Sequence, residues 1–167
     1  AGVLYGEGAY DRAGEVLHAP GDITGDGGVD LLIASTRFGD GDLTYQGAVY
    51  LVPASDVLSS KANDLSTASA QILGAERYDR TGSALSGGDV DGDGTIDMII
   101  GSPSAPENDA IGRVSVFLGP VVGALSATDA DATLAGSGAD DTAGAPLATG
   151  AVDGDGSEDD DSEDDGS

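Results

Sequence analysis

Short apolar runs alternate with glycine- and aspartate-rich segments along this chain. The runs Leu-Leu-Ile-Ala at 31–34 and Met-Ile-Ile-Gly at 98–101 are followed by Ser, or by Ser and Pro. Runs of this length with such boundaries predict buried β-strands, because a buried helix would need about ten or more residues. Segments 47–52 and 112–118 alternate in the way that half-buried strands do. We therefore expect an all-β fold.

One segment is written two and a half times. It reads GDITGDGGVDLLIAS at 21–35, GDVDGDGTIDMIIGS at 88–102 and GAVDGDGSEDDD at 150–161. Each repeat has room for four strands, which in the first repeat are expected at 15–18, 30–35, 47–52 and 70–74. Four antiparallel strands per repeat correspond to one blade of a β-propeller.

The repeat register divides the chain into five segments. They are residues 1–13, the outer strand of a preceding blade and its connection; 14–74 and 82–136, two whole blades with one aspartate loop each; 144–156, the start of a further blade; and 157–167, an acidic tail expected to be disordered. A propeller closes with about four to eight blades. We therefore expect a piece of a longer protein, or copies that assemble into a closed ring or an open filament.

Oxygen-bearing residues recur at positions 1, 3, 5, 7 and 9 of each repeated loop. They are Asp22, Thr24, Asp26, Gly28 (through its carbonyl) and Asp30 in the first loop; Asp89, Asp91, Asp93, Thr95 (through its carbonyl) and Asp97 in the second; and Asp153, Asp155 and Asp159 in the third, where Ala151 stands at position 1. Carboxylates this close repel one another unless a cation lies among them. Six to eight oxygens suit Ca²⁺ better than Mg²⁺, which retains its waters and needs strict octahedral geometry.

We therefore expect Ca²⁺ in these loops, bound more weakly in the first because Thr24 replaces a carboxylate. Asp-Gly turns without metal are the alternative. An EF-hand is excluded, because it needs Glu at position 12, where this chain has Ile33 and Ile100. A dockerin is disfavoured, because its loop would lead into an amphipathic helix rather than an apolar strand.

With its flanks, segment 81–103 resembles an FG-GAP repeat, the unit of the integrin α-subunit β-propeller and of many microbial surface proteins. The Phe of that motif is replaced by Ala13, Thr81 and Ala143. The resemblance implies Ca²⁺ between the first and second strands of a blade. It also implies partner binding on the opposite face, through 36–46, 75–81 and their counterparts 103–111 and 137–143. The candidate ligand-binding residues there are Arg37, Phe38, Tyr45, Arg77, Tyr78 and Arg80.

Composition narrows the partners. The chain has 167 residues and a formal net charge of −25, with 31 Asp and Glu against six Lys and Arg. This acidity argues against nucleic acid and anionic membranes. There is no Cys, so disulfides and thiol chemistry are excluded. No apolar stretch approaches 18 residues, so we expect no membrane insertion.

Catalytic motifs are missing from the sequence. No G-x-S-x-G elbow occurs, and no triad can be composed around His18, the single histidine. We therefore expect a protein that is not an enzyme: an extracellular or cell-surface Ca²⁺-binding module for adhesion or for binding protein or glycan, with a structural metal. One alternative is a subunit that polymerises through blade edges into a surface fibre or sheath. Another is a non-catalytic part of a secreted hydrolase or lyase.

Overall fold

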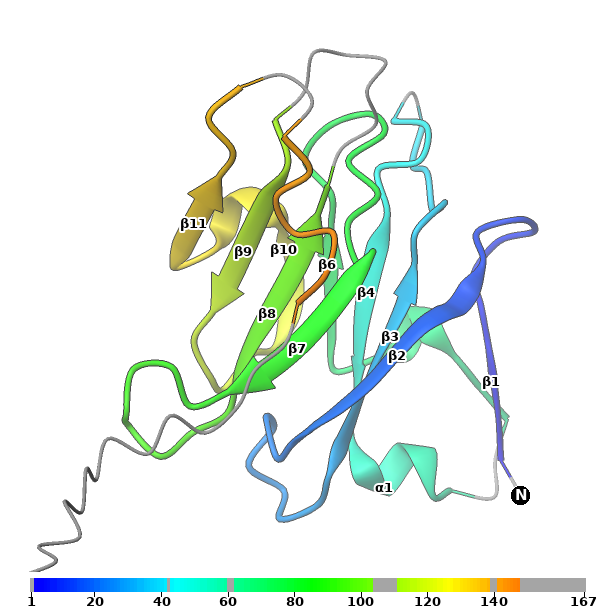
Figure 1. Cartoon of the computed structure of the whole chain (residues 1–167). Coiled ribbons are helices and arrows are strands. Elements are labelled where there is room, and N and C mark those ends of the chain that lie inside the picture. The colour runs from blue at the N-terminus through cyan, green and yellow to red at the C-terminus, as the bar shows by residue number, and fades with distance from the viewer. Residues whose placement is uncertain (1, 42, 60–61, 104–110, 139–140, 148–167) are drawn as a thin grey trace, which may run out of the picture.

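The computed structural model describes residues 2–41, 43–59, 62–103, 111–138 and 141–147, and almost all of its regular elements are strands (Figure 1). The first blade consists of β2 (Ala13–Gly21), β3 (Asp30–Ser35), β4 (Ala48–Val52) and β6 (Ala70–Leu73), side by side in chain order. The second consists of β7 (Ala84–Gly88), β8 (Asp97–Ser102), β9 (Arg113–Phe117) and β11 (Ala132–Ala135) in the same order. Neighbouring strands within each blade are antiparallel. The prediction of an all-β fold with four-stranded blades is confirmed.

Each repeat contributes one short strand that pairs with the outer strand of the repeat before it. β10 (Gly123–Ser126) leaves the second blade between β9 and β11 and pairs in parallel with β6, the outer strand of the first blade. β5 (Ala62–Asp64) occupies the same place in the first repeat and pairs in parallel with β1 (Val3–Tyr5). β1 therefore stands to β5 as β6 stands to β10. The sequence did not predict β5 or β10, because their segments Ala-Asn-Asp and Gly-Ala-Leu-Ser have too few apolar residues to indicate a strand.

Short helical turns accompany the connecting strands. The 3-10 helices η1 (Leu65–Thr67) and η3 (Ala127–Asp129) follow β5 and β10, and the single turn α1 (Ala54–Val57) follows β4. Asp64 caps η1 by accepting from Ser66 N, and Ser126 caps η3 by accepting from Thr128 N. Among the described residues, no helix is both long and apolar enough to cross a bilayer.

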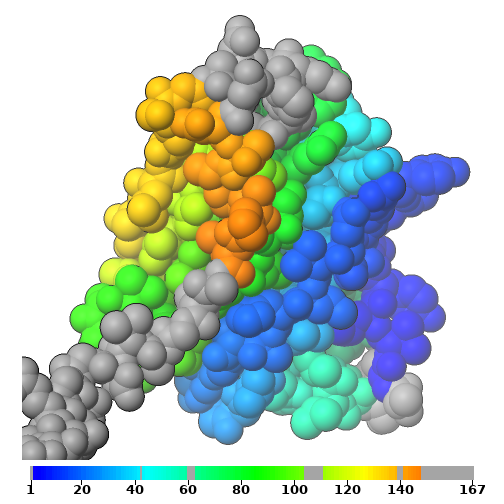
Figure 2. All heavy atoms as spheres, in the orientation of Figure 1, coloured from blue at the N-terminus to red at the C-terminus, as the bar shows by residue number. Residues whose placement is uncertain are grey.

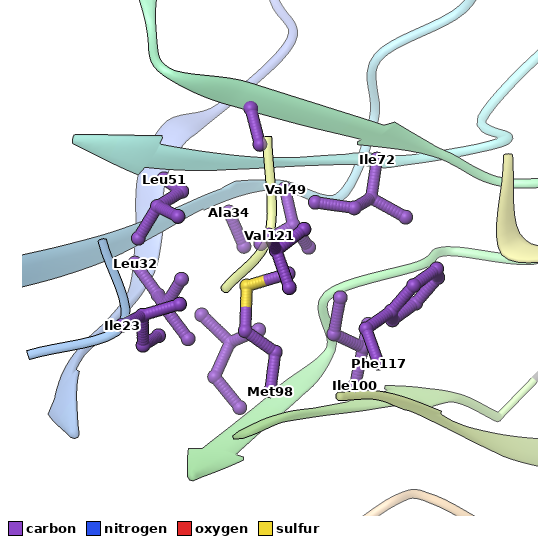
Figure 3. Packing of buried hydrophobic residues seen from close by; sticks show 12 residues of the cluster. Ile23, Leu32, Ala34, Val49, Leu51, Ile72, Met98, Ile100, Phe117 and Val121 are labelled. Atoms are coloured by element: carbon purple, nitrogen blue, oxygen red, sulfur yellow. The ribbon is translucent and has the colours of Figure 1, made fainter. Parts of the chain in front are cut away.

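The main core lies between the two blades (Figure 3). The first blade contributes Ile23, Leu32, Ala34, Val49, Leu51 and Ile72, and the second contributes Leu85, Met98, Ile100, Phe117 and Val121. A second cluster covers the other face of the first blade and contains Ile33, Ala48, Tyr50, Val52 and Leu65. Adjacent residues of β3 thus enter different clusters, which explains why its sequence is continuously apolar instead of alternating. In the space-filling view the first blade (blue to cyan) and the second (green to yellow) lie in contact (Figure 2).

The motif glycine has the same backbone conformation in three successive repeats. Gly14, Gly82 and Gly144 have φ angles of 85°, 91° and 84°, in the left-handed region that glycine adopts without strain. A Cβ atom at Gly82 would lie 2.7 Å from the Cβ of Ala34 in the neighbouring blade. Glycine at this position therefore permits the left-handed conformation in all three repeats and, at Gly82, the close approach of the two blades.

Candidate metal centres

The two aspartate loops lie at the same end of the two blades, at the lower edge of Figure 1. Each connects the first strand of its blade to the second, and β3 and β8 begin at Asp30 and Asp97. The prediction that these loops join strands, and do not lead into helices, is confirmed. Carboxylate oxygens lie within 4.8 Å of one another in each loop: those of Asp22, Asp26 and Asp30 in the first, and those of Asp89, Asp91 and Asp97 in the second.

The ninth-position carboxylate organises the first loop. Asp30 is 0% exposed, and its Oδ2 accepts hydrogen bonds from Ile23 N at 2.9 Å and Thr24 N at 2.8 Å. Its Oδ1 accepts from Ala54 N at 3.1 Å, in the turn that follows β4. One buried side chain therefore ties the loop to the connection after the third strand.

Asp97 does the same in the second loop. It is 1% exposed, its Oδ2 accepts from Val90 N at 2.7 Å, and its Oδ1 accepts from Gly119 N at 2.9 Å, just after β9. Among the described residues, backbone N–H groups donate to these buried carboxylates and no basic side chain pairs with them. The repeated sequence thus produces the same hydrogen bonding in two blades.

The first-position aspartates accept hydrogen bonds from backbone N–H groups later in each loop. Asp22 Oδ1 accepts from Asp26 N at 3.0 Å, and its Oδ2 accepts from Gly27 N at 2.9 Å. Asp89 Oδ2 accepts from Gly94 N at 2.9 Å, and its Oδ1 accepts from Gly92 N at 2.7 Å. Asp26 Oδ1 in turn accepts from Gly28 N at 2.8 Å, so backbone donors hold the carboxylates at positions 1, 5 and 9 of the first loop.

Positions 3 and 5 differ between the loops. Asp91 joins the second cluster at position 3, but Asp93 at position 5 does not, and its Oδ1 accepts from Thr95 N at 2.7 Å. In the first loop Asp26 joins the cluster at position 5, and position 3 is Thr24. The Oγ1 of Thr24 is buried and has no hydrogen-bond partner among the described residues. A buried oxygen with unused lone pairs, in the same loop as three clustered carboxylates, fits a hard cation such as Ca²⁺.

Asp93 and the position-7 carbonyls of Gly28 and Thr95 remain predicted ligands. The third loop, with Asp153, Asp155 and Asp159, lies outside the described residues, as does the acidic tail.

Four of the six predicted ligand-binding residues form one row at the opposite end of the blades. Arg37 Cζ lies 5.5 Å from the ring centroid of Tyr45, and Arg77 Cζ lies 5.5 Å from that of Tyr78. The two tyrosine rings meet edge to face, with centroids 5.8 Å apart. Phe38 is half-buried and packs against the second cluster, on the other face of the first blade, so only part of its surface is open to a ligand. Two loops far apart in sequence therefore present a joint surface of arginine and tyrosine.

The turn before each first strand is held by an aspartate. Asp79 is buried, and its Oδ2 accepts from Ala75 N and Glu76 N, both at 2.9 Å. Burial raises the pKa of Asp79, although the bonds from Glu76 N and Ala75 N and the charge of Arg113 oppose this shift. The exposed counterpart Asp141 accepts from Ser137 N at 2.6 Å, and this bond lowers its pKa.

Comparison with known proteins identifies the repeat. Residues 81–117 match the family model of the FG-GAP repeat. These residues are an FG-GAP repeat. The matched range contains β7, the second aspartate loop, β8 and β9. The family suggested by the sequence is therefore confirmed over residues 81–117.

Three curated relatives share the same description, phosphatidylinositol-glycan-specific phospholipase D. The chain is 40% identical to the protein of Rattus norvegicus over 107 residues, 37% identical to that of Mus musculus over 107, and 36% identical to that of Bos taurus over 106. Each alignment covers 63% of this chain and 12% of the relative. The chain therefore corresponds to a small part of each of these proteins.

Proposed function

We propose that this FG-GAP module is an extracellular, calcium-stabilised binding unit for adhesion or for protein or glycan recognition. Ca²⁺ occupies both aspartate loops, and the loops at 36–46 and 75–81 contact the partner. The observation that carries the proposal is the repetition of one carboxylate cluster, with matching backbone hydrogen bonds, at the same end of two blades.

The chemistry of the loops favours Ca²⁺ among common cations. Three carboxylates meet within 4.8 Å in each loop, the first loop also holds the buried neutral oxygen of Thr24, and no histidine lies in either loop. All-oxygen sites with flexible geometry select Ca²⁺ over Zn²⁺, which prefers nitrogen and sulfur, and over Mg²⁺. Exposed loops with part of their ligands neutral are typical of weak sites that fill at the roughly 10⁻⁴ to 10⁻³ M Ca²⁺ of extracellular fluids.

In this proposal the metal has a structural role. Asp30 and Asp97 tie each loop to the connection that follows the third strand, so an ion held by these carboxylates also braces the blade. The rigid blade then fixes the spacing of the loops at its opposite end. Removal of Ca²⁺ should lower the stability of the module, and we expect it to affect no catalytic activity of the module.

Calcium titration by calorimetry tests the metal sites. We expect two Ca²⁺ per chain from the described loops, and a third if the third loop also binds. Asp91→Asn should weaken one site. Thr24→Val should weaken the other without destabilising the metal-free protein, because the buried hydroxyl has no partner to lose among the described residues. Asp40→Asn, an equal change of charge at an exposed position in the opposite loops, is the matched control. Equal Ca²⁺ affinity in all four proteins would refute the assignment.

The relatives favour a second candidate, a non-catalytic part of a secreted hydrolase. They are phospholipases D specific for phosphatidylinositol-glycan, and the chain covers 12% of each. In such a protein this module would bind, and the remainder of the chain would carry the hydrolytic site. Incubating the isolated chain with a phosphatidylinositol-glycan substrate should give binding without hydrolysis; release of phosphatidic acid would overturn this candidate.

A further inference from the structure

A small cleft opens between the first strands of the two blades, at the end away from the aspartate loops. Its volume is about 230 Å³. The polar residues that line it are Arg12, Glu15, Thr36, Arg37, Arg80 and Ser83, and Val16 is the one apolar residue of the lining. Three of the six Lys and Arg of a chain with net charge −25 therefore lie around one cavity.

The positive charge of this cleft is only partly neutralised. Glu15 forms an ion pair with Arg12 at 2.7 Å and accepts a short hydrogen bond from the hydroxyl of Thr36. That hydroxyl and the nearby guanidinium groups hold the pKa of Glu15 below its usual value, so Glu15 is charged at neutral pH. Among the described residues, neither Arg37 nor Arg80 has an ion-pair partner. Two guanidinium groups are left to attract an anion.

Backbone hydrogen bonds fix the main chain at each of the three arginines. Arg37 N donates to Asp11 O at 3.2 Å, Arg12 O accepts from Glu15 N at 3.0 Å, and Arg80 N donates to Tyr45 O at 3.1 Å. Arg37 also stacks on the ring of Tyr45. The guanidinium groups of Arg12 and Arg37 are thus held, by Glu15 and Tyr45, and a donor that is already ordered loses less conformational entropy when a ligand binds.

Two of the arginines occupy an unusual backbone conformation in equivalent turns. Arg12 and Arg80 have φ angles of 58° and 51°, in a region that glycine adopts without strain. They end the repeated triplets Tyr10-Asp11-Arg12 and Tyr78-Asp79-Arg80. Arg12 was not among the predicted ligand-binding residues, although it aligns with Arg80 in these two triplets.

The size and polarity of the lining favour a sugar over a peptide. Peptide-binding sites depend on apolar and aromatic anchors, whereas six of the seven lining residues here are polar or charged. Guanidinium groups bind carboxylate and phosphate through two parallel hydrogen bonds, and hydroxyl and carboxylate oxygens can bond to sugar hydroxyls. Pockets for drug-sized ligands measure about 300–1,000 Å³, so a smaller cleft suits a single ring.

We infer that this cleft binds one acidic sugar unit of a glycan, with its carboxylate or phosphate between Arg37 and Arg80. The inference rests on the proposed binding function and specifies its ligand. Glu15 and the hydroxyl of Ser83 contact the hydroxyl groups of the sugar. The negative charge on the rest of the chain repels long polyanions, which restricts recognition to an isolated acidic unit.

Calorimetric or NMR titration of the folded chain, with Ca²⁺ saturating and salt low, tests the inference. The probes are glucuronate, glucose 6-phosphate, glucose, acetate, inorganic phosphate and an aspartate-rich peptide. We expect glucuronate or glucose 6-phosphate to bind more tightly than glucose and than the matching free anion, and added salt to weaken the complex. The acid that binds better identifies the anion.

Variants locate the site. Arg37→Gln and Arg80→Gln should each weaken binding about ten-fold or more, because each removes a charged hydrogen bond. Glu15→Gln should strengthen binding, because it removes the one negative charge among the lining residues. Arg113→Gln, whose partner Glu76 lies outside the lining, changes the chain's charge equally and should leave affinity unchanged.

Three results would overturn the inference: equal affinities in Arg37→Gln, Arg80→Gln and Arg113→Gln, binding of the free anions as tight as that of the sugars, or binding of the acidic peptide alone. The calcium titration described above tests a separate claim, so either experiment can fail while the other succeeds. Sugar binding without any Ca²⁺ response would remove the calcium assignment and leave the cleft assignment standing.

Discussion

Calcium removal should destabilise this protein by an amount that the loops allow to be estimated. Within each cluster three carboxylates lie within 4.8 Å, which makes three repulsive pairs. A pair at that distance costs about 1 kcal/mol in water and about 3 kcal/mol at the effective dielectric constant of a protein surface. One cluster without a cation therefore costs roughly 3 to 10 kcal/mol, which is comparable with the whole stability of a domain.

At the tighter end of the proposed affinity range, a dissociation constant of about 10⁻⁴ M, Ca²⁺ at about 10 mM is about a hundred times the dissociation constant and stabilises the folded state by about 2.7 kcal/mol per site. Two sites give about 5 kcal/mol. In a chain of this length each kcal/mol shifts the midpoint by about 2–4 °C. We therefore expect chelation to lower the thermal midpoint by roughly 10–20 °C.

Differential scanning calorimetry in Ca²⁺ and in chelator, at matched ionic strength, measures this shift, with Mg²⁺ as a second comparison. Asp91→Asn separates the two contributions to the estimate. It should raise the midpoint of the metal-free protein, because one repulsive charge is gone, and lower that of the calcium-bound protein, because one ligand is weakened. Asp40→Asn should shift both states equally. A midpoint that does not respond to Ca²⁺, or an Asp91→Asn effect of the same sign in both states, would refute the reasoning.

Three further predictions concern other parts of the molecule. Thr24→Asp should raise the Ca²⁺ affinity of the first loop in a competitive chelator titration, because it supplies the carboxylate that Asp91 provides in the second; no gain would mean that position 3 does not face the ion. Met98→Ala, at a side chain that is 0% exposed between the blades, should cost about 2–5 kcal/mol in urea unfolding, whereas Leu134→Ala, at 61% exposure on β11, should cost far less; equal costs would contradict the packing. Asp79→Asn keeps an acceptor for the two backbone donors and removes a buried charge whose folded pKa is raised, so the variant should be more stable than the parent at pH 7. That advantage should shrink as the pH falls toward about 4, where the parent carboxyl becomes protonated in both states, and an advantage that does not change with pH would contradict the burial effect.

The sequence located the elements whose residues repeat. β3 was expected at 30–35 and is found at Asp30–Ser35, because an aspartate that must accept backbone donors and a serine beyond the core define its two ends. β2 is longer than the expected 15–18 and runs from Ala13 to Gly21. Its register shifts between Ala13 and Val16 and between His18 and Gly21, and such irregularities interrupt the alternation that predicts a strand.

Features formed by residues distant in sequence were not predictable from periodicity. The cleft joins Arg12, Thr36 and Arg80 from three separate turns, and nothing in the local sequence of any one turn marks it as part of a site. The edge-to-face contact of Tyr45 with Tyr78 depends on the packing of one blade turn against another. Loop spacing likewise gave Asp93 the same place as Asp26, and both accept from the N–H two residues later, yet only Asp26 lies in the carboxylate cluster of its loop.

The parallel pairing of β10 with β6 bears on how such repeats can be duplicated or exchanged. A segment cut at the glycine before β7 would lose nothing from its own four-stranded sheet, yet it would carry away the strand that finishes its neighbour. Insertion of a new repeat therefore alters two sheets at once. It adds a strand to the sheet of the blade before it, and its own outer strand, equivalent to β11, becomes the edge with which the blade after it can pair. A transplanted repeat would be tolerated where the recipient offers an edge resembling β6, and a search for functional chimaeras should choose crossover points by that edge.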